Sequence, residues 1–373
     1  MYIPSLPGLI KLLVRRPRLL TVAGHNWAGQ IRHRLSRNHS AGLSPPPEQL
    51  TVVVTDKCNL RCQMCQYAYS DAPGYQLNHL GHMKPSLFQK LLRETEGRPL
   101  ISLTGGEPLL HPEINELIAY AHQRGHVVTL TTNGWFLPKQ AQKLCAAGLD
   151  ILVVSVDGPQ AVHDRIRGAR VFEKLSEGIQ TVLALPSRPI VFISMVISDL
   201  NYDQLETMHE LALSWGVDGL NFNHLWMQTE EMAASCLAQF GSAFAIDHIT
   251  WDINPEFIDV LKLTDSLEAV QRRSRFQPLL VTETPFLNPR QRAIWYQEPA
   301  HFIKWTRTRC AWTRLKVWPD GSVKACRDFQ VGNIQTEHAM AVWNSGKMRG
   351  FRQFLSQHGV MPICARCCYM AHP

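Results

Sequence analysis

The feature that most limits the fold of this chain is a regular alternation of β-branched runs and amphipathic stretches between residues 50 and 224. Strands that alternate with helices indicate parallel pairing through right-handed crossovers, and hence an α/β fold. In such folds the chemistry collects at the carboxyl ends of the strands. The predicted strands are 50–55, 100–104, 126–131, 150–155, 190–196 and 217–223, and the predicted helices are 85–95, 112–124, 138–147, 171–185 and 202–215.

A loop with three cysteines follows the first predicted strand. Cys58, Cys62 and Cys65 stand in C-x3-C-x2-C spacing just after the β-branched run, so they lie at the carboxyl end of that strand. Three thiolates on one loop can hold a [4Fe-4S] cluster and leave one iron without a protein ligand. The alternatives are a chance occurrence and a structural zinc loop, although zinc sites normally take four ligands from paired C-x2-C units.

Composition and charge narrow the class of protein. Apolar residues make up 45% of the 373-residue chain, enough for a sizeable core. No apolar run reaches the roughly eighteen residues that a membrane-spanning helix requires. The ten cysteines fall mainly in two clusters, which is typical of a reduced, intracellular, metal-binding protein. Residues 1–47 hold seven Lys and Arg and no Asp or Glu, whereas the remainder is formally neutral, so the charge does not indicate a nucleic-acid-binding face.

The basic N-terminal arm and linker, residues 1–48, have three interpretations. The arm can pack on the main domain, lie on an anionic membrane surface, or serve as an organelle transit peptide. Leucines alternate with basic residues over 5–21, and Pro17 interrupts or ends any helix there. Its short apolar core and uncharged start argue against a secretory signal. We therefore expect a cytoplasmic protein, peripheral at the membrane if the second interpretation holds.

Polar and glycine residues follow the other predicted strands. The run Gly105-Gly106-Glu107-Pro108 lets the backbone approach a ligand closely and offers a carboxylate to a cation. His224 can act as a general base or substrate ligand, although a structurally hydrogen-bonded histidine is the commoner outcome. Asn133-Gly134 could be only a turn, and Arg167 could be only a surface ion pair. The further polar positions at strand ends are Ser155, Asp157 and Asn223.

A second cysteine set occupies the last part of the chain. Alternating apolar and polar residues around Pro319-Asp320-Gly321 predict a β-hairpin that brings the first two cysteines of this set together. A predicted helix at about 338–357 separates them from a C-x2-C pair. Four thiolates can saturate an iron–sulfur cluster or form a four-cysteine zinc site. The set is Cys310, Cys326, Cys364 and Cys367, with Cys368 as an alternative to Cys367.

A long connection rich in aromatic residues spans 225–309. We expect helices near 228–240 and 255–273, and then an extended piece that carries Pro278, Pro285 and Pro289. Connections of this length are usually lids or substrate-binding elements, so we predict a substrate lid here. The single cysteine within it, Cys236, is expected in the core.

The order and spacing of these motifs resemble the radical S-adenosylmethionine (radical SAM) enzymes, and the run from Cys310 through Gly321 to Cys326 is similar to the start of a SPASM domain. The resemblance covers about residues 50–224 and 310–368. It implies a partial (β/α)6 TIM barrel at 49–224 and a truncated, twitch-like SPASM domain at 310–373. The second cysteine set would saturate one auxiliary [4Fe-4S] cluster, which favours electron transfer.

The same resemblance implies a role for each motif. The first three cysteines hold the SAM-binding [4Fe-4S] cluster. The Gly-Gly-Glu-Pro run binds the SAM amino group, while Ser155 serves the ribose region, Arg167 a carboxylate and the Val196 backbone the adenine. Asn223 and His224 are the catalytic candidates over the barrel mouth. The SAM-binding set is Met64, Gly105, Gly106, Glu107, Pro108, Asn133, Ser155, Asp157, Arg167 and Val196.

The activity implied by the resemblance is reductive cleavage of SAM to a 5′-deoxyadenosyl radical, which abstracts a hydrogen atom from the substrate. A two-electron oxidation, an epimerisation or a crosslink would follow. The expected substrate is a sugar, an alcohol, a lipid-linked saccharide or a peptide side chain, and the expected reductant is a flavodoxin or ferredoxin. The rival is a non-catalytic iron–sulfur or zinc scaffold or electron carrier, in which the Gly-Gly-Glu-Pro run has no purpose.

Overall fold

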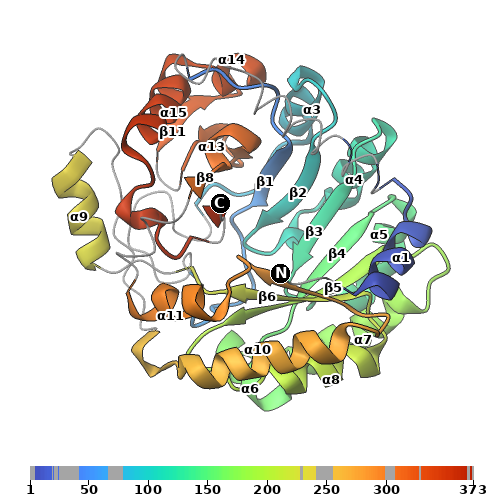
Figure 1. Ribbon diagram of the computed structural model, residues 1–373. Helices are drawn as coiled ribbons and strands as arrows, with labels where there is room; N and C mark the ends of the chain where they lie inside the picture. Colours follow the sequence, from blue (N-terminus) through green and yellow to red (C-terminus); the bar gives the residue numbers. More distant parts are fainter. Residues whose placement is uncertain are drawn as a thin grey trace.

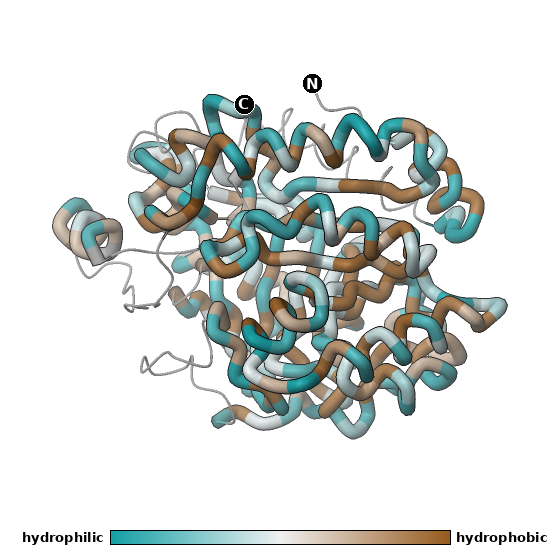
Figure 2. Tube along the Cα trace, turned by 90° about the horizontal axis from the view of Figure 1, so that it is seen from below, coloured by the Kyte–Doolittle hydropathy of each residue, from teal (hydrophilic) through white to brown (hydrophobic). Residues whose placement is uncertain are grey.

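A curled sheet with helices on its outer side forms the centre of the molecule (Figure 1). The computed structural model describes residues 5–18, 20, 24, 42–65, 79–226, 230–240, 255–298, 307–326, 329–367 and 370–371. In this part of the chain the large sheet has ten strands in the order β11-β10-β9-β1-β2-β3-β4-β5-β6-β7, and it does not close on itself. Figure 2 shows hydrophobic residues along the central strands and more hydrophilic ones on the outer helices.

The six strands that the sequence predicts are all present, and each neighbouring pair of them runs parallel. The prediction of an α/β fold with a parallel, incomplete barrel is therefore confirmed. The strands are β1 (Gln49–Thr55), β2 (Leu100–Gly105), β3 (Val128–Thr132), β4 (Ile151–Ser155), β5 (Ile190–Ile197) and β6 (Gly219–His224).

The predicted connecting helices cover the outer face because their apolar residues repeat at helical spacing. In α3, for example, Leu87, Leu91 and Leu92 are buried against the sheet. Two short helices at strand ends, η2 (Pro108–Leu110) and α6 (Gln160–Arg167), were not predicted. Their residues belong to stretches in which the sequence showed only candidate binding residues. The predicted helices are α3 (Pro85–Glu94), α4 (Ile114–Gln123), α5 (Leu137–Ala146), α7 (Phe172–Leu183) and α8 (Leu205–Trp215).

The long connection contains a further strand, β7, where an extended piece was expected between Pro278 and Pro285. The expectation is wrong at Pro289, which begins a helix. β7 (Leu280–Thr284) pairs parallel with β6 and follows α10 (Val260–Ser274), which adds a seventh unit to the six expected. α11 (Pro289–Gln297) begins at a proline that its first turn tolerates, with a capping box between Asn288 and Gln291. Prolines obscured both elements in the sequence. α9 (Glu230–Phe240) and η4 (Pro255–Phe257) precede them.

The C-terminal hairpin forms as predicted and joins the barrel sheet. β9 (Arg314–Val317) pairs antiparallel with β10 (Ser322–Lys324) and parallel with β1. The single helix expected at about 338–357 is wrong, because Ser345 interrupts it and caps a second helix by accepting from the Met348 amide. The other elements here are β8 (Arg307–Thr308), α13 (Cys310–Thr313), β11 (Gln330–Asn333), α14 (Ala339–Trp343), α15 (Gly346–His358), η6 (Pro362–Cys364) and β12 (Met370–Ala371).

The described start of the basic arm packs on the main domain. α1 (Leu6–Arg15) ends before Pro17, and its Leu12 packs with Ile190 and Leu280. Its outer face exposes large apolar side chains, including Leu6 and Val14. Contact of that face with lipid stays a prediction. Among the described residues, no helix has both the length and the apolar character needed to cross a membrane.

A buried carboxylate fastens α1 to the barrel, and its loss should destabilise the fold. Asp218 is fully buried and accepts from Arg188 at 3.1 Å, while Lys11 and Arg15 each lie 3.2 Å from it. Asp218→Asn leaves the buried Arg188 without its counter-ion, so we expect a loss of about 3–5 kcal/mol in the free energy of unfolding, measured in urea. Asp203→Asn, which removes an exposed pair with Lys262, should cost less than about 1 kcal/mol. Equal losses in the two variants would contradict the role of Asp218.

Candidate functional site

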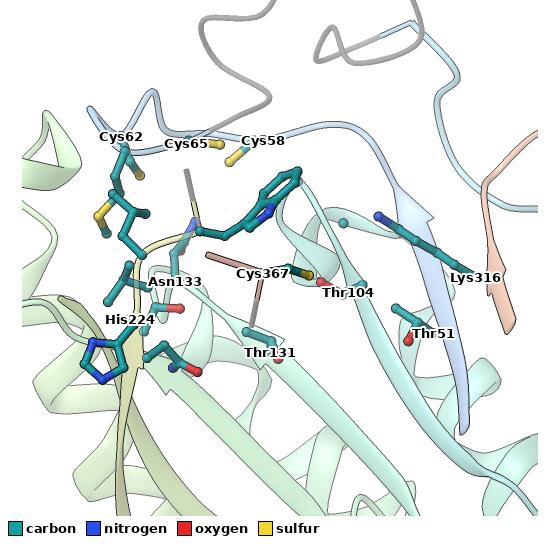
Figure 3. A pocket seen from close by; sticks show the side chains of 18 of the residues that line it. Thr51, Cys58, Cys62, Cys65, Thr104, Thr131, Asn133, His224, Lys316 and Cys367 are labelled. Carbon is teal, nitrogen blue, oxygen red and sulfur yellow. The ribbon is translucent and has the colours of Figure 1, made fainter. Parts of the chain in front are cut away.

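A cavity of about 500 Å³ lies at the carboxyl ends of the parallel strands. Its wall includes residues at the ends of β2, β3, β4 and β6, where the sequence predicts the chemistry. Both cysteine sets line it, although they lie at opposite ends of the chain. The lining thiols are those of Cys58, Cys62, Cys65, Cys310, Cys326, Cys364 and Cys367. Figure 3 shows the first three together at one side of the pocket, with Cys367 facing the same space.

The first cysteine set presents soft sulfur donors, and two of its thiols, those of Cys58 and Cys62, resist ionisation in the protein alone. Burial raises the pKa of Cys58 to about 12, partly opposed by the Leu60 amide. Burial also raises the pKa of Cys62, although the charge of Arg167 opposes this. Thiols of this kind lose their protons to solvent when a metal centre binds, and three sulfur donors around a cavity fit an iron–sulfur cluster with one open position. Among the described residues, no three His, Cys, Asp or Glu side chains converge closely enough to enclose a single ion.

The glycine pair is needed because the backbone of the cysteine loop lies directly against it. A Cβ on Gly105 would lie 2.0 Å from the Thr55 carbonyl oxygen, and one on Gly106 would lie 2.3 Å from that of Lys57. Hydrogen bonds run across the same contact, from Gly106 N to Thr55 O (2.9 Å) and from Glu107 N to Lys57 O (2.7 Å). The close approach that the sequence predicts is therefore made, in this structure, to the start of the cysteine loop.

Glu107 joins the ends of two strands from inside the wall. Its carboxylate accepts from Leu109 N (2.9 Å), Thr132 Oγ1 (2.7 Å) and Asn133 N (2.8 Å). Burial raises the pKa of this carboxyl group, and the three hydrogen bonds oppose the rise. Oε2 accepts one of these bonds and keeps acceptor capacity toward a cation in the cavity.

Asn133 connects the cysteine loop to β3. The side-chain Nδ2 of Asn133 donates to Asn59 Oδ1 at 2.9 Å, and the Oδ1 of Asn133 accepts from Trp135 N at 3.0 Å. Ser155, Val196 and Met64 also line the cavity, so the structure brings them together with the glycine run. Their roles toward SAM stay predictions.

Arg167 is buried between a carboxylate and a cysteine sulfur. Its Nε donates to Asp157 Oδ2 at 2.6 Å, and its Nη1 lies 3.7 Å from Cys62 Sγ. Although burial alone would lower the pKa of Arg167, Asp157 and Cys62 raise it, so the guanidinium stays charged. Burial and this neighbouring charge lower the pKa of His163 to about 2, which keeps it neutral as an acceptor for Asp157 N. Arg167 therefore stabilises negative charge on Cys62 and is not the surface ion pair that the sequence left open.

Both ring nitrogens of His224 form hydrogen bonds with other residues of the protein. Nδ1 lies 2.7 Å from the Tyr296 hydroxyl and Nε2 lies 2.8 Å from Glu283 Oε1. Burial would raise the pKa of Glu283, but His224 and Arg292 hold it below its usual value. This arrangement favours the structural alternative for His224 over the general base. Asn223 donates to Ser194 Oγ at 2.6 Å and lines the cavity beside it.

The second cysteine set surrounds the other side of the cavity. Burial raises the pKa of Cys364, and the thiols of Cys326, Cys310 and Cys236 raise it further. Of these, Cys310, Cys326 and Cys364 line the cavity. Cys367 N donates to Cys364 O at 3.0 Å within the C-x2-C turn. These four thiols fit a cluster without an open position. Cys368 lies outside the described residues.

Arg366 and Cys236 lie close to the second cysteine set without belonging to it. Arg366 has a left-handed φ of 76°, and it donates to Trp295 O (2.9 Å) and Tyr296 O (2.8 Å). The C-x2-C turn is thereby fastened to α11. Cys236 is fully buried in a cluster with Ile363 and Cys364, as a core residue would be. Nothing in the sequence indicated the contact of Arg366, because it depends on a helix about seventy residues earlier.

Several cationic and hydroxyl side chains line the cavity, and the sequence indicated no role for them. For the three cations on the hairpin, the available signal was the alternation of charged and apolar residues along β9 and β10. The lining residues concerned are Thr51, Thr104, Thr131, Arg314, Lys316 and Lys324.

Comparison with known proteins agrees with these features. The family model of the radical SAM superfamily matches residues 52–212, and that of an iron–sulfur cluster-binding domain, SPASM, matches residues 309–368. A GTP 3′,8-cyclase of Chlorobaculum tepidum is 34% identical over 172 residues, which are 44% of this chain and 50% of that protein. The chain thus spans about half the length of this curated relative.

Two other proteins match most of the chain, one by sequence and one by fold. The tungsten-containing aldehyde ferredoxin oxidoreductase cofactor-modifying protein of Pyrococcus furiosus is 23% identical over 333 residues, covering 85% of this chain and 86% of that protein. Crystal structures of Streptococcus suis SuiB share the fold at 15% identity. The one bound to S-adenosylmethionine has a TM-score of 0.60 and covers 87% of this chain and 72% of that chain. The one bound to precursor peptide SuiA has a TM-score of 0.62 and covers 90% and 74%.

Proposed function

Because this chain belongs to the radical SAM proteins and carries a C-terminal SPASM domain, we propose that it cleaves SAM reductively and oxidises a substrate held in the shared cavity. The observation that carries the proposal is that both cysteine sets line one cavity of about 500 Å³. A substrate bound there would meet both cluster sites without leaving the protein. In the scaffold alternative this shared cavity has no purpose.

The protein's own residues would hold, orient and shield the reacting groups. Cys58, Cys62 and Cys65 would hold the SAM-binding [4Fe-4S] cluster, and the second cysteine set the auxiliary one. Bound SAM and the reduced cluster together supply a 5′-deoxyadenosyl radical. Arg167 would stabilise the Cys62 thiolate, and the buried wall of strand ends would exclude water from the reaction.

The substrate in this proposal is a sugar, an alcohol, a lipid-linked saccharide or a peptide side chain. The peptide alternative is supported by the fold shared with SuiB, whose structure includes a precursor peptide. The closed ligand set of the auxiliary site supports two-electron oxidation over epimerisation. A saturated cluster can accept the second electron from the substrate after the hydrogen atom has left, whereas epimerisation would need a hydrogen atom returned from a cysteine thiol. A flavodoxin or ferredoxin would supply the first electron.

The test is anaerobic reconstitution followed by iron counting and detection of 5′-deoxyadenosine after reduction with dithionite and SAM. We expect about eight irons per chain, as two four-iron clusters require, together with deoxyadenosine. Zinc in place of iron, or iron without SAM cleavage, would support the scaffold alternative.

Removal of one thiol of the second cysteine set should remove the auxiliary cluster and leave the SAM-binding cluster in place. We expect Cys364→Ala to retain about four irons and some deoxyadenosine formation, because the first cysteine set is untouched. Cys236→Ala is the matched control, since Cys236 is buried in the same apolar cluster but does not line the cavity. It should keep about eight irons. Loss of four irons in the control, or eight irons in Cys364→Ala, would refute the assignment of the second set.

A further inference from the structure

Small neutral polar side chains cover the inner face of β5, β6 and β7, next to the cavity. Successive side chains of a strand point to opposite faces, so Ser194 shares a face with Val196, and Asn221 shares a face with Asn223. Val196 and Asn223 line the cavity. The parallel register places Ser194 beside Asn221, and Asn221 beside Thr282. We call this set the polar shelf; its members are Ser194, Asn221, Asn223, Thr282 and Thr284.

The members of the polar shelf bond to one another and keep capacity for a ligand. Asn221 Oδ1 accepts from Thr282 Oγ1 at 2.7 Å and from Thr284 Oγ1 at 3.1 Å. The side chain of Asn223 accepts from Asn221 Nδ2 at 2.9 Å and donates to Ser194 Oγ at 2.6 Å. These bonds leave the serine O–H, one N–H of each asparagine and the lone pairs of both threonines available. All five side chains are partly exposed, so a ligand can reach them.

The strands that carry the polar shelf hold almost no charge. In β5, β6 and β7 the ionisable side chains are His224 and Glu283, which are buried and lie 2.8 Å apart. Glu283 stands between the two threonines along β7, so its side chain points away from the shelf. A charged ligand would meet no counter-ion on these strands, whereas a ligand rich in hydroxyl groups would find both donors and acceptors.

A closed apolar layer lies next to the polar shelf, toward the amino ends of the strands. Phe192 stands beside Gly219, and Gly219 stands beside Leu280. The Phe192 ring covers the glycine, because a Cβ on Gly219 would lie 2.2 Å from a ring carbon. Phe192 and Leu280 also pack with Leu12 of α1. A ligand on the shelf would therefore lie between this layer and the cavity.

We propose that the polar shelf binds the hydroxyl groups of a saccharide, which is the substrate. This inference rests on the proposed function and narrows its substrate class. Each hydroxyl group of a sugar ring donates and accepts, so one ring can satisfy several members of the shelf at once. An apolar peptide side chain at the same place would leave those groups without partners. Because Asn223 also lines the cavity, the bound saccharide would extend toward the two cysteine sets.

The experiment uses two fractions of an extract from bacterial cells grown in heavy water, one of neutral saccharides and one of protease-released peptides. Each fraction is added to the anaerobically reconstituted full-length protein with SAM and dithionite in ordinary water. Deuterium on oxygen and nitrogen exchanges with the water, so deuterium that reaches the 5′ carbon of deoxyadenosine comes from a C–D bond of the substrate. We expect mass spectrometry to detect deuterated deoxyadenosine with the saccharides and only the background amount with the peptides.

Removal of single hydroxyl groups should weaken saccharide binding. Ser194→Ala and Thr282→Val should each lower the amount of saccharide retained in equilibrium dialysis about twofold to tenfold, the range that one neutral hydrogen bond gives. The dissociation constant of SAM, measured by the same method, should stay unchanged in both variants. Thr181→Val is the matched control, since the Thr181 hydroxyl donates to Glu177 O within α7. This variant should retain as much saccharide as the wild type.

Several outcomes would overturn the proposal. Deuterium transfer from the peptides that equals or exceeds transfer from the saccharides would do so, and this test needs only the wild type. Saccharide retention that survives both shelf substitutions would also do so. A rise in the dissociation constant of SAM as large as the loss of saccharide retention would assign the polar shelf to the ribose of SAM instead.

The two readouts keep this inference separate from the proposed function. Deoxyadenosine that stays undeuterated with the saccharide fraction would retain SAM cleavage and overturn the saccharide substrate. Saccharide retention that depends on Thr282, in a protein that forms no deoxyadenosine, would retain the polar shelf and overturn the reaction.

Discussion

Replacing Cys62 by serine should reduce 5′-deoxyadenosine formation to the background level and lower the iron count from about eight to about four per chain. Cys62 is 7% exposed, lines the cavity, and lies 3.7 Å from the Arg167 guanidinium. A serine hydroxyl fits the space but is a hard donor that stays protonated, so it cannot replace a thiolate on iron. The measurement is chromatographic detection of deoxyadenosine beside iron and sulfide analysis.

Cys145→Ser is the matched control for this prediction. Cys145 is a half-buried thiol on α5 that belongs to neither cysteine set. This variant should keep its iron and its deoxyadenosine formation. If Cys62→Ser still forms deoxyadenosine at a rate comparable to the wild type, the first cysteine set does not hold the reactive cluster.

Replacing Gly106 by alanine should displace the start of the cysteine loop and destabilise the protein. The added methyl group would lie 2.3 Å from Lys57 O, 2.6 Å from Lys57 C and 2.9 Å from Asp56 O, and all three are backbone atoms. Backbone cannot move aside as a flexible side chain can, so we expect a loss of about 1–3 kcal/mol or more in the free energy of unfolding. The same shift should reduce iron incorporation, because it moves the segment that leads to Cys58.

The control for this prediction is Gly350→Ala. Gly350 lies within α15, and a Cβ there would meet no heavy atom within 4 Å. Alanine should be neutral or stabilise the helix by up to about 1 kcal/mol. Urea unfolding and iron counts measured in parallel check both variants. Equal stability of Gly106→Ala and the wild type would mean that the glycine serves the ligand and not the loop.

The sequence predicted those parts of the fold that depend on local pattern. The six central strands appeared because each is a short β-branched run between amphipathic stretches, and the hairpin appeared because Pro319-Asp320-Gly321 marks its turn. β7 was expected only as an extended piece because its run of five residues stands among prolines. The helix predicted at about 338–357 is two helices, since one serine cap outweighed a continuous amphipathic pattern.

Contacts between distant segments explain most of what the sequence could not predict about the site. The sequence pattern identified Asp157 and Arg167 as candidate site residues. It did not indicate that Arg167 contacts Cys62, about a hundred positions earlier. His224 was proposed as a base because strand ends carry chemistry. Its partners Glu283 and Tyr296 come from β7 and α11, two elements that were not predicted.

Because β9 pairs parallel with β1, the segments that carry the two cysteine sets belong to one continuous sheet. Domains joined by a linker can rock against each other, whereas strands paired in one sheet keep a fixed spacing of about 4.8 Å. The separation of the two sets is therefore fixed by the fold and does not depend on a hinge. A chain cut before β9 would leave β1 as an open edge, a surface prone to pairing with other molecules. The C-terminal segment thus covers the β1 edge of the open barrel sheet as well as supplying thiols.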